Sequence, residues 1–205
     1  MRATRDLLRR RTHLLRRRAE RLAHVQNTNS PCNRPEIGQK IAYKANRDGV
    51  AERFVEPAVQ KRIAVALAPI TSYDPLLGAI ARSSVQTAKH HDANPLSLVH
   101  TVPGIGKRLG PVLLDEIHDS ARFPRGQACV SYARLVKWAK GSAGKRLGTS
   151  GKKTGNAHLK GAFSEAAVLC LRNKPTGQKY LARLEKQHDQ GEAFTIPAHK
   201  LARAV

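Results

Sequence analysis

Apolar residues recur at helical spacing in the first part of the chain. Leu8, Leu15 and Leu22 lie seven residues apart among polar and charged neighbours. A repeat of seven places these leucines along one seam of a helix, as is typical of a coiled coil. We therefore predict a helix over residues 1–26.

A second apolar-periodic stretch runs from Glu56 to about His91 and follows a segment, residues 27–37, whose Asn and Pro predict a loop. Pro69 and Pro75 lie within this stretch, and each destabilises a helix interior by about 3 kcal/mol. The second helix is therefore expected to be interrupted. Two such helices suggest either an antiparallel helical hairpin or a dimerising coiled coil.

The chain from residue 94 onward has the pattern of a compact helical domain. Helices are expected at about 94–101, 107–118, 126–137, 156–170, 178–188 and 192–204. The intervening residues 139–155 include five glycines and almost no bulky apolar residue, so a loop is predicted there. The predicted fold class is all-α, with a basic helical or coiled-coil segment over 1–92 and a helical domain over 93–205.

The net charge of the chain restricts the class of molecule that it is expected to bind. Lys and Arg number 37 against 15 Asp and Glu, a formal net charge of +22. Such a chain repels itself unless a polyanion screens it, which favours nucleic acid as partner, although a ribosomal-type or chromatin-type protein would show the same balance. Aromatic residues make up 4%, too few for the base-stacking sheets of many RNA binders. The nine arginines from Arg2 to Arg21 fit either a solvated helix face or phosphate contact.

Metal and membrane chemistry are not expected. Cys32, Cys129 and Cys170 form no CxxC pair, which argues against a zinc site or disulfide framework and for a reducing compartment. His90 and His91 lack a partner at ligand spacing, so no cofactor is expected in this chain. No apolar run is expected to approach the ~20 residues of a membrane span. The expected location is the bacterial cytoplasm, at the nucleoid when DNA is bound.

A sharp turn between two helices is predicted at Pro103–Lys107. The glycines on either side of Ile105 let the backbone turn, with Ile105 filling the gap and the amides of Gly104, Gly106 and Lys107 pointing outward. Amides at the positive end of the next helix suit a phosphate. This is the pattern of a helix-hairpin-helix element, which binds the DNA backbone without reading sequence. A tight turn without a ligand is the alternative.

The glycine-rich segment carries candidate chemistry of another kind. No acidic residue lies between Asp119 and Glu165, whereas ten cations do. Cations and glycine-loop amides stabilise the charge that develops in phosphoryl transfer, and a serine there could attack a DNA phosphodiester. Hydroxyl groups in basic loops are more often phosphate donors or solvated. The hydroxyls concerned are Ser142, Thr149, Ser150 and Thr154.

Two runs, TVPGIGKRLGPVLLDEIHDSARFP and VSYARLVKWAKGSAGKRLGTSGKKTGNAHLKGAFSEAA, resemble the C-terminal domain of a group of bacterial insertion-sequence transposases. The type members of the group are the insertion sequences one-hundred-ten and one-hundred-sixteen. The resemblance covers about residues 95–172. In that family a RuvC-like domain supplies four acidic metal ligands, a coiled coil follows, and the C-terminal domain supplies a catalytic serine. Better-studied members are recombinases guided by a structured RNA from the element.

The resemblance implies site residues and partners. Ser142, in a Ser-x-Gly-Lys stretch, is the expected nucleophile, and Ser150 is the second choice. DNA is the expected partner, with the element's guide RNA as a further one, and a divalent metal is expected only with the acidic domain. The residues expected to bind nucleic acid are Gly104, Ile105, Gly106, Lys107, Arg108, Lys140, Lys145, Arg146, Lys152, Lys153, Asn156 and Lys160.

The function expected from these observations is that of a DNA-binding transposase in DNA transposition and recombination. No cluster of Asp and Glu precedes the predicted coiled coil, so a fragment that is not competent alone is expected. One alternative is a non-catalytic basic nucleic-acid-binding protein. Another is a regulatory partner of an intact transposase, paired through the N-terminal helices, which could also form a homo-oligomer.

Overall fold

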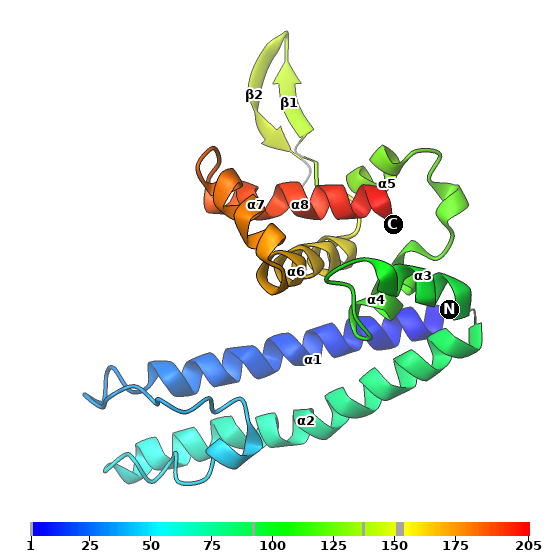
Figure 1. Cartoon of the computed structure of the whole chain (residues 1–205). Helices are drawn as coiled ribbons and strands as arrows, with labels where there is room; N and C mark the ends of the chain where they lie inside the picture. Colours follow the sequence, from blue (N-terminus) through cyan, green and yellow to red (C-terminus); the bar gives the residue numbers. More distant parts are fainter. Residues whose placement is uncertain (1, 92, 137, 151–153) are drawn as a thin grey trace. The chain divides into compact units, whose positions relative to one another are not determined.

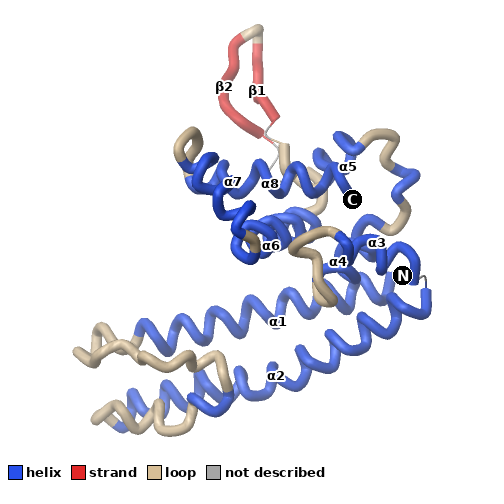
Figure 2. Tube along the Cα trace, viewed as in Figure 1, coloured by secondary structure: helices blue, strands red, loops and turns tan. Residues whose placement is uncertain are grey.

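The computed structural model describes residues 2–91, 93–136, 138–150 and 154–205, and these form two compact units (Figure 1). One unit is Asp6–Ser83, and the other comprises Ser84–Val205 with the N-terminal residues up to Arg5. Helices dominate both units, which confirms the all-α class (Figure 2). Within the described residues, one two-stranded hairpin is the sole exception.

The N-terminal unit is built on α1 (Arg2–Asn27) and α2 (Pro57–His91), with a short 3-10 helix, η1 (Lys44–Asn46), in the segment between them. The helices run antiparallel, because Arg18 of α1 pairs with Asp74 of α2 while Val25 packs in one cluster with Ile63. Of the two predicted arrangements, the chain itself therefore forms the helical hairpin. The buried members of the cluster are Val25, Ile41, Val50, Phe54, Ile63 and Ala66.

A cluster of charged side chains ties the connecting segment to both helices. The Asp74 carboxylate accepts from Arg18 Nε at 2.7 Å and from Arg47 Nη2 at 2.6 Å. Arg47 is only 6% exposed, and it also donates to the carbonyl oxygens of Ile41 at 3.0 Å and Ala42 at 2.9 Å. Arg18 donates to the same Ala42 oxygen at 2.6 Å. One carboxylate thus holds α1, α2 and the connecting segment together.

The two arginines also determine the ionisation of this carboxyl. Burial raises the pKa of Asp74, but the hydrogen bonds and charges of Arg47 and Arg18 outweigh it and hold the pKa below its ordinary value of 3.8. Asp74 is therefore ionised throughout the neutral range, and its stabilising contribution is lost only in acid.

The predicted interruption of the second helix is wrong, because α2 continues through Pro69 and Pro75. A proline removes one N–H bond to the carbonyl four residues earlier, here Val65 and Thr71. Both of those residues are exposed, so water can solvate the freed carbonyl groups. Packing of the opposite face of α2, together with the Asp74 ion pairs, keeps the helix continuous.

α2 also changes the expectation about membranes. By length and composition Pro57–His90 could cross a bilayer, with a mean hydropathy of 1.5 over its most apolar window, of which 22% is buried in the chain. The expectation that no apolar run reaches such a length is therefore wrong for this helix. One helix of this kind is weak evidence for a membrane span, since core helices of soluble proteins pass the same test.

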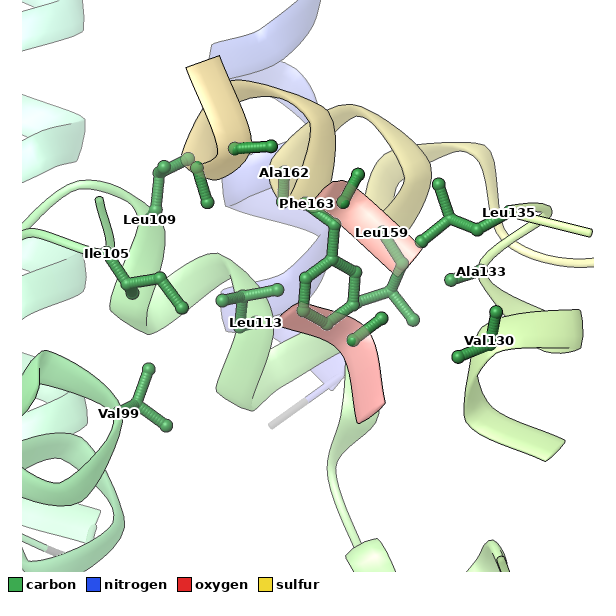
Figure 3. Packing of buried hydrophobic residues seen from close by; sticks show 14 residues of the cluster. Val99, Ile105, Leu109, Leu113, Val130, Ala133, Leu135, Leu159, Ala162 and Phe163 are labelled. Carbon is green, nitrogen blue, oxygen red and sulfur yellow. The ribbon is translucent and has the colours of Figure 1, made fainter. Parts of the chain in front are cut away.

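The C-terminal unit contains the remaining elements. In chain order they are α3 (Ala93–Thr101), α4 (Leu109–Ile117), η2 (Ser120–Arg122), α5 (Gly126–Tyr132), β1 (Trp138–Ser142), β2 (Lys145–Ser150), α6 (Ala157–Asn173), α7 (Pro175–Glu185) and α8 (Gln190–Ala204). α6 lies at the centre and contacts α4, α7 and α8. Its Phe163 is fully buried and packs among Leu113 of α4 and Leu159 of α6 (Figure 3).

Two local predictions in this unit are wrong. α5 ends at Tyr132 rather than near residue 137, because Arg134 adopts a left-handed backbone with φ +56°. The segment predicted as a loop over 139–155 instead forms the β1–β2 hairpin over 138–150. Its turn residues Ala143 and Gly144 have φ +48° and +75°, as the tight hairpin turns that match strand twist require. Glycine-rich composition alone does not distinguish such a hairpin from a loop.

The Asp74 cluster generates a testable prediction. Asp74→Asn should lower the free energy of unfolding of the N-terminal unit by about 2 kcal/mol at pH 7, because buried Arg47 loses its anionic partner. Since the folded pKa lies below 3.8, this stabilisation is complete above about pH 5 and disappears as the pH falls through the folded pKa. The difference between wild type and variant should shrink accordingly in thermal unfolding followed by circular dichroism from pH 7 to pH 2.5.

Asp48→Asn, which removes an exposed carboxylate of the same unit, is the matched control and should leave the transition almost unchanged. Identical unfolding of wild type and Asp74→Asn at pH 7 would show that the cluster does not stabilise the unit.

Candidate nucleic-acid interface

The turn between α3 and α4 carries the first group of candidate residues. Ile105 N donates to Val102 O at 3.1 Å, and the amides of Leu109 and Gly110 both donate to Gly106 O at 3.0 Å. Ile105 is 3% exposed and lies in the core with Leu109 (Figure 3). Its side chain therefore fills the gap between the helices and is not available to a nucleic acid.

Gly104 fixes this turn against the central helix. It adopts φ +90°, and a Cβ atom at this position would collide with the backbone oxygen of Ala166 and lie 2.9 Å from Cys170 N on α6. Gly106, two residues later, has open space around its Cα and no positive φ. The two glycines of the motif thus have different roles, since the first permits close backbone packing and the second faces outward.

The outward side of the turn presents backbone amides and cations. Gly106, Lys107 and Arg108 are exposed. Within the described part of the chain, none of their three amides donates a backbone hydrogen bond. These amides precede α4, at the end of the helix where the partial charge is positive. The turn therefore offers free N–H donors beside two cationic side chains, which is the chemistry that a phosphate requires.

The second group of candidates lies around Asn156, where a helix was expected to begin and which is the N-cap of α6. Its Oδ1 accepts from His158 N at 2.9 Å and Leu159 N at 3.2 Å, and its backbone N donates to Tyr132 O at 2.6 Å. Its Nδ2 donates to Glu116 Oε2 at 2.7 Å, and Glu116 is 1% exposed. The side chain of Asn156 is thus fully engaged inside the protein and does not face a nucleic acid.

Glu116 was missed by the sequence analysis. It follows the buried Leu109 and Leu113 of α4 at the spacing of a core position. A carboxylate at such a position indicates a buried polar partner, and this was the available signal. The pair joins α4 to the start of α6.

The ends of the β1–β2 hairpin are held together at this same point. Arg134 Nε donates to Gly155 O at 2.9 Å, and Leu135 N donates to Val130 O at 3.1 Å. Gly155 has φ +90°, and a Cβ atom there would lie 2.5 Å from Tyr132 O. A residue before β1 and a residue after β2 are therefore bound to each other and to the C-terminal end of α5.

The candidate nucleophile lies at the tip of the hairpin. In the antiparallel register Trp138 pairs with Ser150, and Ser142 pairs with Lys145 across the turn. Gly141 pairs with Arg146 while Lys140 pairs with Gly148, so a β-bulge leaves one extra residue in β2. Ser142 is thus the last residue of β1, and Ser150 is at the opposite end, near the root. Figure 2 shows the hairpin projecting from the helices of its unit.

The remaining candidates fall into three sets. Lys145 and Lys160 are exposed, the first at the hairpin turn and the second in the first turn of α6. Lys140 and Arg146 are placed by backbone position only, one on each strand. Lys152 and Lys153 lie outside the described residues. The structure therefore brings the α3–α4 turn, the hairpin root and α6 into one unit.

Arg122 of η2 lies against two aromatic rings, one of them from the last residue of α5. Its guanidinium lies 5.0 Å from the ring centroid of Phe123 and 4.9 Å from that of Tyr132. Burial raises the pKa of the nearby Cys129 thiol, which the charge of Arg122 only partly offsets. Cys129 therefore stays protonated and is a poor nucleophile. Among the described residues, no three His, Cys, Asp or Glu side chains gather where they could hold a metal ion.

Comparison with known proteins bears on this unit. Residues 96–182 match the family described as "Transposase IS116/IS110/IS902 family". A curated protein of Streptomyces coelicolor, "Insertion element IS110 uncharacterized 43.6 kDa protein", is 34% identical over 113 residues, which are 55% of this chain and 27% of the relative. The aligned part of this chain thus spans about a quarter of the relative's length. The family match includes the α3–α4 turn, the hairpin and α6.

The two glycines of the turn allow a paired test. Gly104→Ala should destabilise the C-terminal unit by about 3 kcal/mol, because the methyl group meets backbone atoms of α6 and the residue needs a positive φ. Gly106→Ala should change stability by about 0.5 kcal/mol or less. Urea unfolding followed by circular dichroism compares them, and equal stabilities would contradict the docking role of Gly104.

The Asn156 cap generates a local prediction. Asn156→Ala removes the acceptor of two α6 amides and one donor to buried Glu116, so the amides of His158 and Leu159 should exchange with solvent about 10-fold to 100-fold faster. Hydrogen exchange read by mass spectrometry measures this. Gln127→Ala removes an exposed amide side chain from α5 and serves as control. Unchanged exchange at both α6 amides would show that the cap is dispensable.

Proposed function

Because residues 96–182 belong to the IS116/IS110/IS902 transposase family, we propose that the C-terminal unit binds DNA in transposition, with the phosphate backbone held at the α3–α4 turn. The observation that carries this proposal is the set of three backbone amides at the exposed residues Gly106, Lys107 and Arg108, none of which donates a backbone hydrogen bond within the described residues. Amides in such a turn contact phosphates irrespective of base sequence. The net charge of +22 supports the same partner.

The second part of the proposal concerns the chemistry. Ser142 Oγ attacks the phosphorus of a DNA phosphodiester, forms a phosphoserine ester and displaces a deoxyribose oxygen, which takes up a proton and leaves as a free hydroxyl group. Its position beside the hairpin turn, across from exposed Lys145, supports this role, because a cation there can stabilise charge on the phosphoryl oxygens. Ser150, at the root end of β2, is the second candidate.

Phosphate binding can be tested separately from chemistry. The double variant Lys107→Gln/Arg108→Gln should weaken binding of a short duplex about tenfold at 0.1 M salt and reduce the dependence of log K on log salt by about 1 to 2. Fluorescence anisotropy across a salt series measures both. Lys179→Gln/Lys186→Gln removes the same charge from exposed positions of α7 or its C-terminal end and should have a much smaller effect. Equal losses in the two variants would contradict a phosphate site at the turn.

The chemistry is tested by incubating the full chain with DNA from the ends of the element and searching for a covalent adduct that survives denaturation. An adduct lost in Ser142→Ala and kept in Ser150→Ala supports Ser142, and the reverse pattern assigns the role to Ser150. An adduct kept in both variants excludes both serines. Binding without any adduct would favour a non-catalytic DNA-binding role for this chain.

A further inference from the structure

The arginines of α1 form two groups that the sequence alone does not separate. Arg18 is committed to the Asp74 cluster, and Arg9 and Arg11 have partners within the protein. Four others on the same helix within the N-terminal unit are exposed. We call these four the cationic row: Arg10, Arg16, Arg17 and Arg21.

The cationic row is almost unneutralised. No described residue forms an ion pair or hydrogen bond with the side chains of Arg10, Arg16 or Arg21. Arg17 contacts Glu20 at 3.2 Å, but both side chains are more than half exposed, at 57% and 62%. An ion pair so exposed contributes little and is easily exchanged for another anion. From Leu7 to Asn27 Glu20 is the only carboxylate of α1.

The row also has a defined geometry. At about 100° per residue, Arg10, Arg17 and Arg21 fall within about 40° of one another around the helix axis, and at 1.5 Å per residue they extend over about 16 Å. Arg16 lies about 120° around the axis from these three, at the side of the row. Leu8, which is buried, lies on the opposite face of the helix, about 160° around the axis from the centre of these three arginines. A strand of duplex DNA advances about 3.4 Å per phosphate along its axis, so the row matches about five successive phosphates.

A merely solvated helix face does not account for this arrangement. Arg17 and Arg21 are four residues apart, where like charges destabilise an isolated helix by about 0.2–0.5 kcal/mol. Exposed helix faces that serve only solubility usually carry both signs of charge, which lowers that repulsion. The arginines of the row repel one another, and a bound polyanion would neutralise this repulsion.

We propose that the cationic row is a second nucleic-acid site, in the N-terminal unit, which binds the phosphate backbone of a duplex. It lies outside residues 96–182, the segment of the family match, and it does not depend on the α3–α4 turn or on Ser142. The shared chemistry is a row of phosphates, which either a DNA or an RNA duplex supplies, and the experiment distinguishes these sources.

The test uses the full chain and 20-base-pair duplexes of unrelated sequence, one of DNA and one of RNA. A variant in which all four residues of the row are changed from Arg to Gln should lose at least tenfold in affinity at 0.1 M salt. Its salt slope for DNA should fall by about 3, since up to four phosphate contacts disappear. Loss for both duplexes supports a general phosphate site, and loss for one of them identifies the source.

A matched control removes four exposed positive charges from the rest of the same unit: Lys40→Gln, Lys44→Gln, Lys61→Gln and Arg62→Gln. The control should lose less than threefold in affinity. Equal losses in the two variants would mean that only net charge matters, and no loss in the row variant would also overturn the proposal. Circular dichroism verifies that both variants keep their helices.

A footprint on the unaltered protein gives an independent measurement. Phenylglyoxal modifies accessible arginines, and mass spectrometry locates the modified residues. A bound duplex should protect Arg10, Arg17 and Arg21 at least threefold, whereas exposed Arg62 should remain reactive. Protection of Arg62 to the same degree, or none at the row, would contradict the site. Variants of Lys107 and Arg108 should leave this protection in place, which separates the failure of this proposal from failure of the function proposed above.

Discussion

The C-terminal unit depends on the hydrogen bond between Asn156 and Glu116. A buried carboxylate is costly unless donors surround it, and a helix start is costly unless its first amides find acceptors. Asn156 contributes to both at once, because its Nδ2 donates to Glu116 and its Oδ1 accepts from two amides of α6. Its backbone N–H binds Tyr132 at the end of α5. Three helices and both ends of the β1–β2 hairpin are thereby located relative to one point.

The helical pattern was readable from the sequence wherever apolar periodicity and local signals agreed. α1 and α6 follow from the spacing of leucines and alanines, and the start of α6 was expected at Asn156. The predicted interruption of α2 was wrong because the helix preference of proline describes only the local chain. The burial of Ile63 and Ile70 and the pairing of Asp74 are tertiary interactions, which that preference does not include. Tertiary packing of this kind exceeds the ~3 kcal/mol of a single proline.

The candidate site was only partly readable, for a similar reason. Sequence spacing located the turn and assigned Ile105 to the gap between helices, and the structure places it there. The sequence could not reveal that the side chain of Asn156 is hydrogen-bonded to Glu116, because the two residues are 40 positions apart. Nor could it separate the arginines of α1, since Arg18 differs from Arg17 only through a carboxylate on another helix. The composition of the chain cannot show the role of a residue when its partner is distant in the sequence.

The root of the β1–β2 hairpin has a consequence for how such chains can vary. Arg134 and Gly155 close the hairpin at its base, and its turn needs only the two residues Ala143 and Gly144. The length of the two strands determines how far the turn lies from this base. Lengthening each strand by two residues would carry the backbone of Ser142 outward by about 7 Å, since a strand rises about 3.3 Å per residue. The number of residues in each strand therefore sets how far the backbone of Ser142 lies from the helical core, without altering that core.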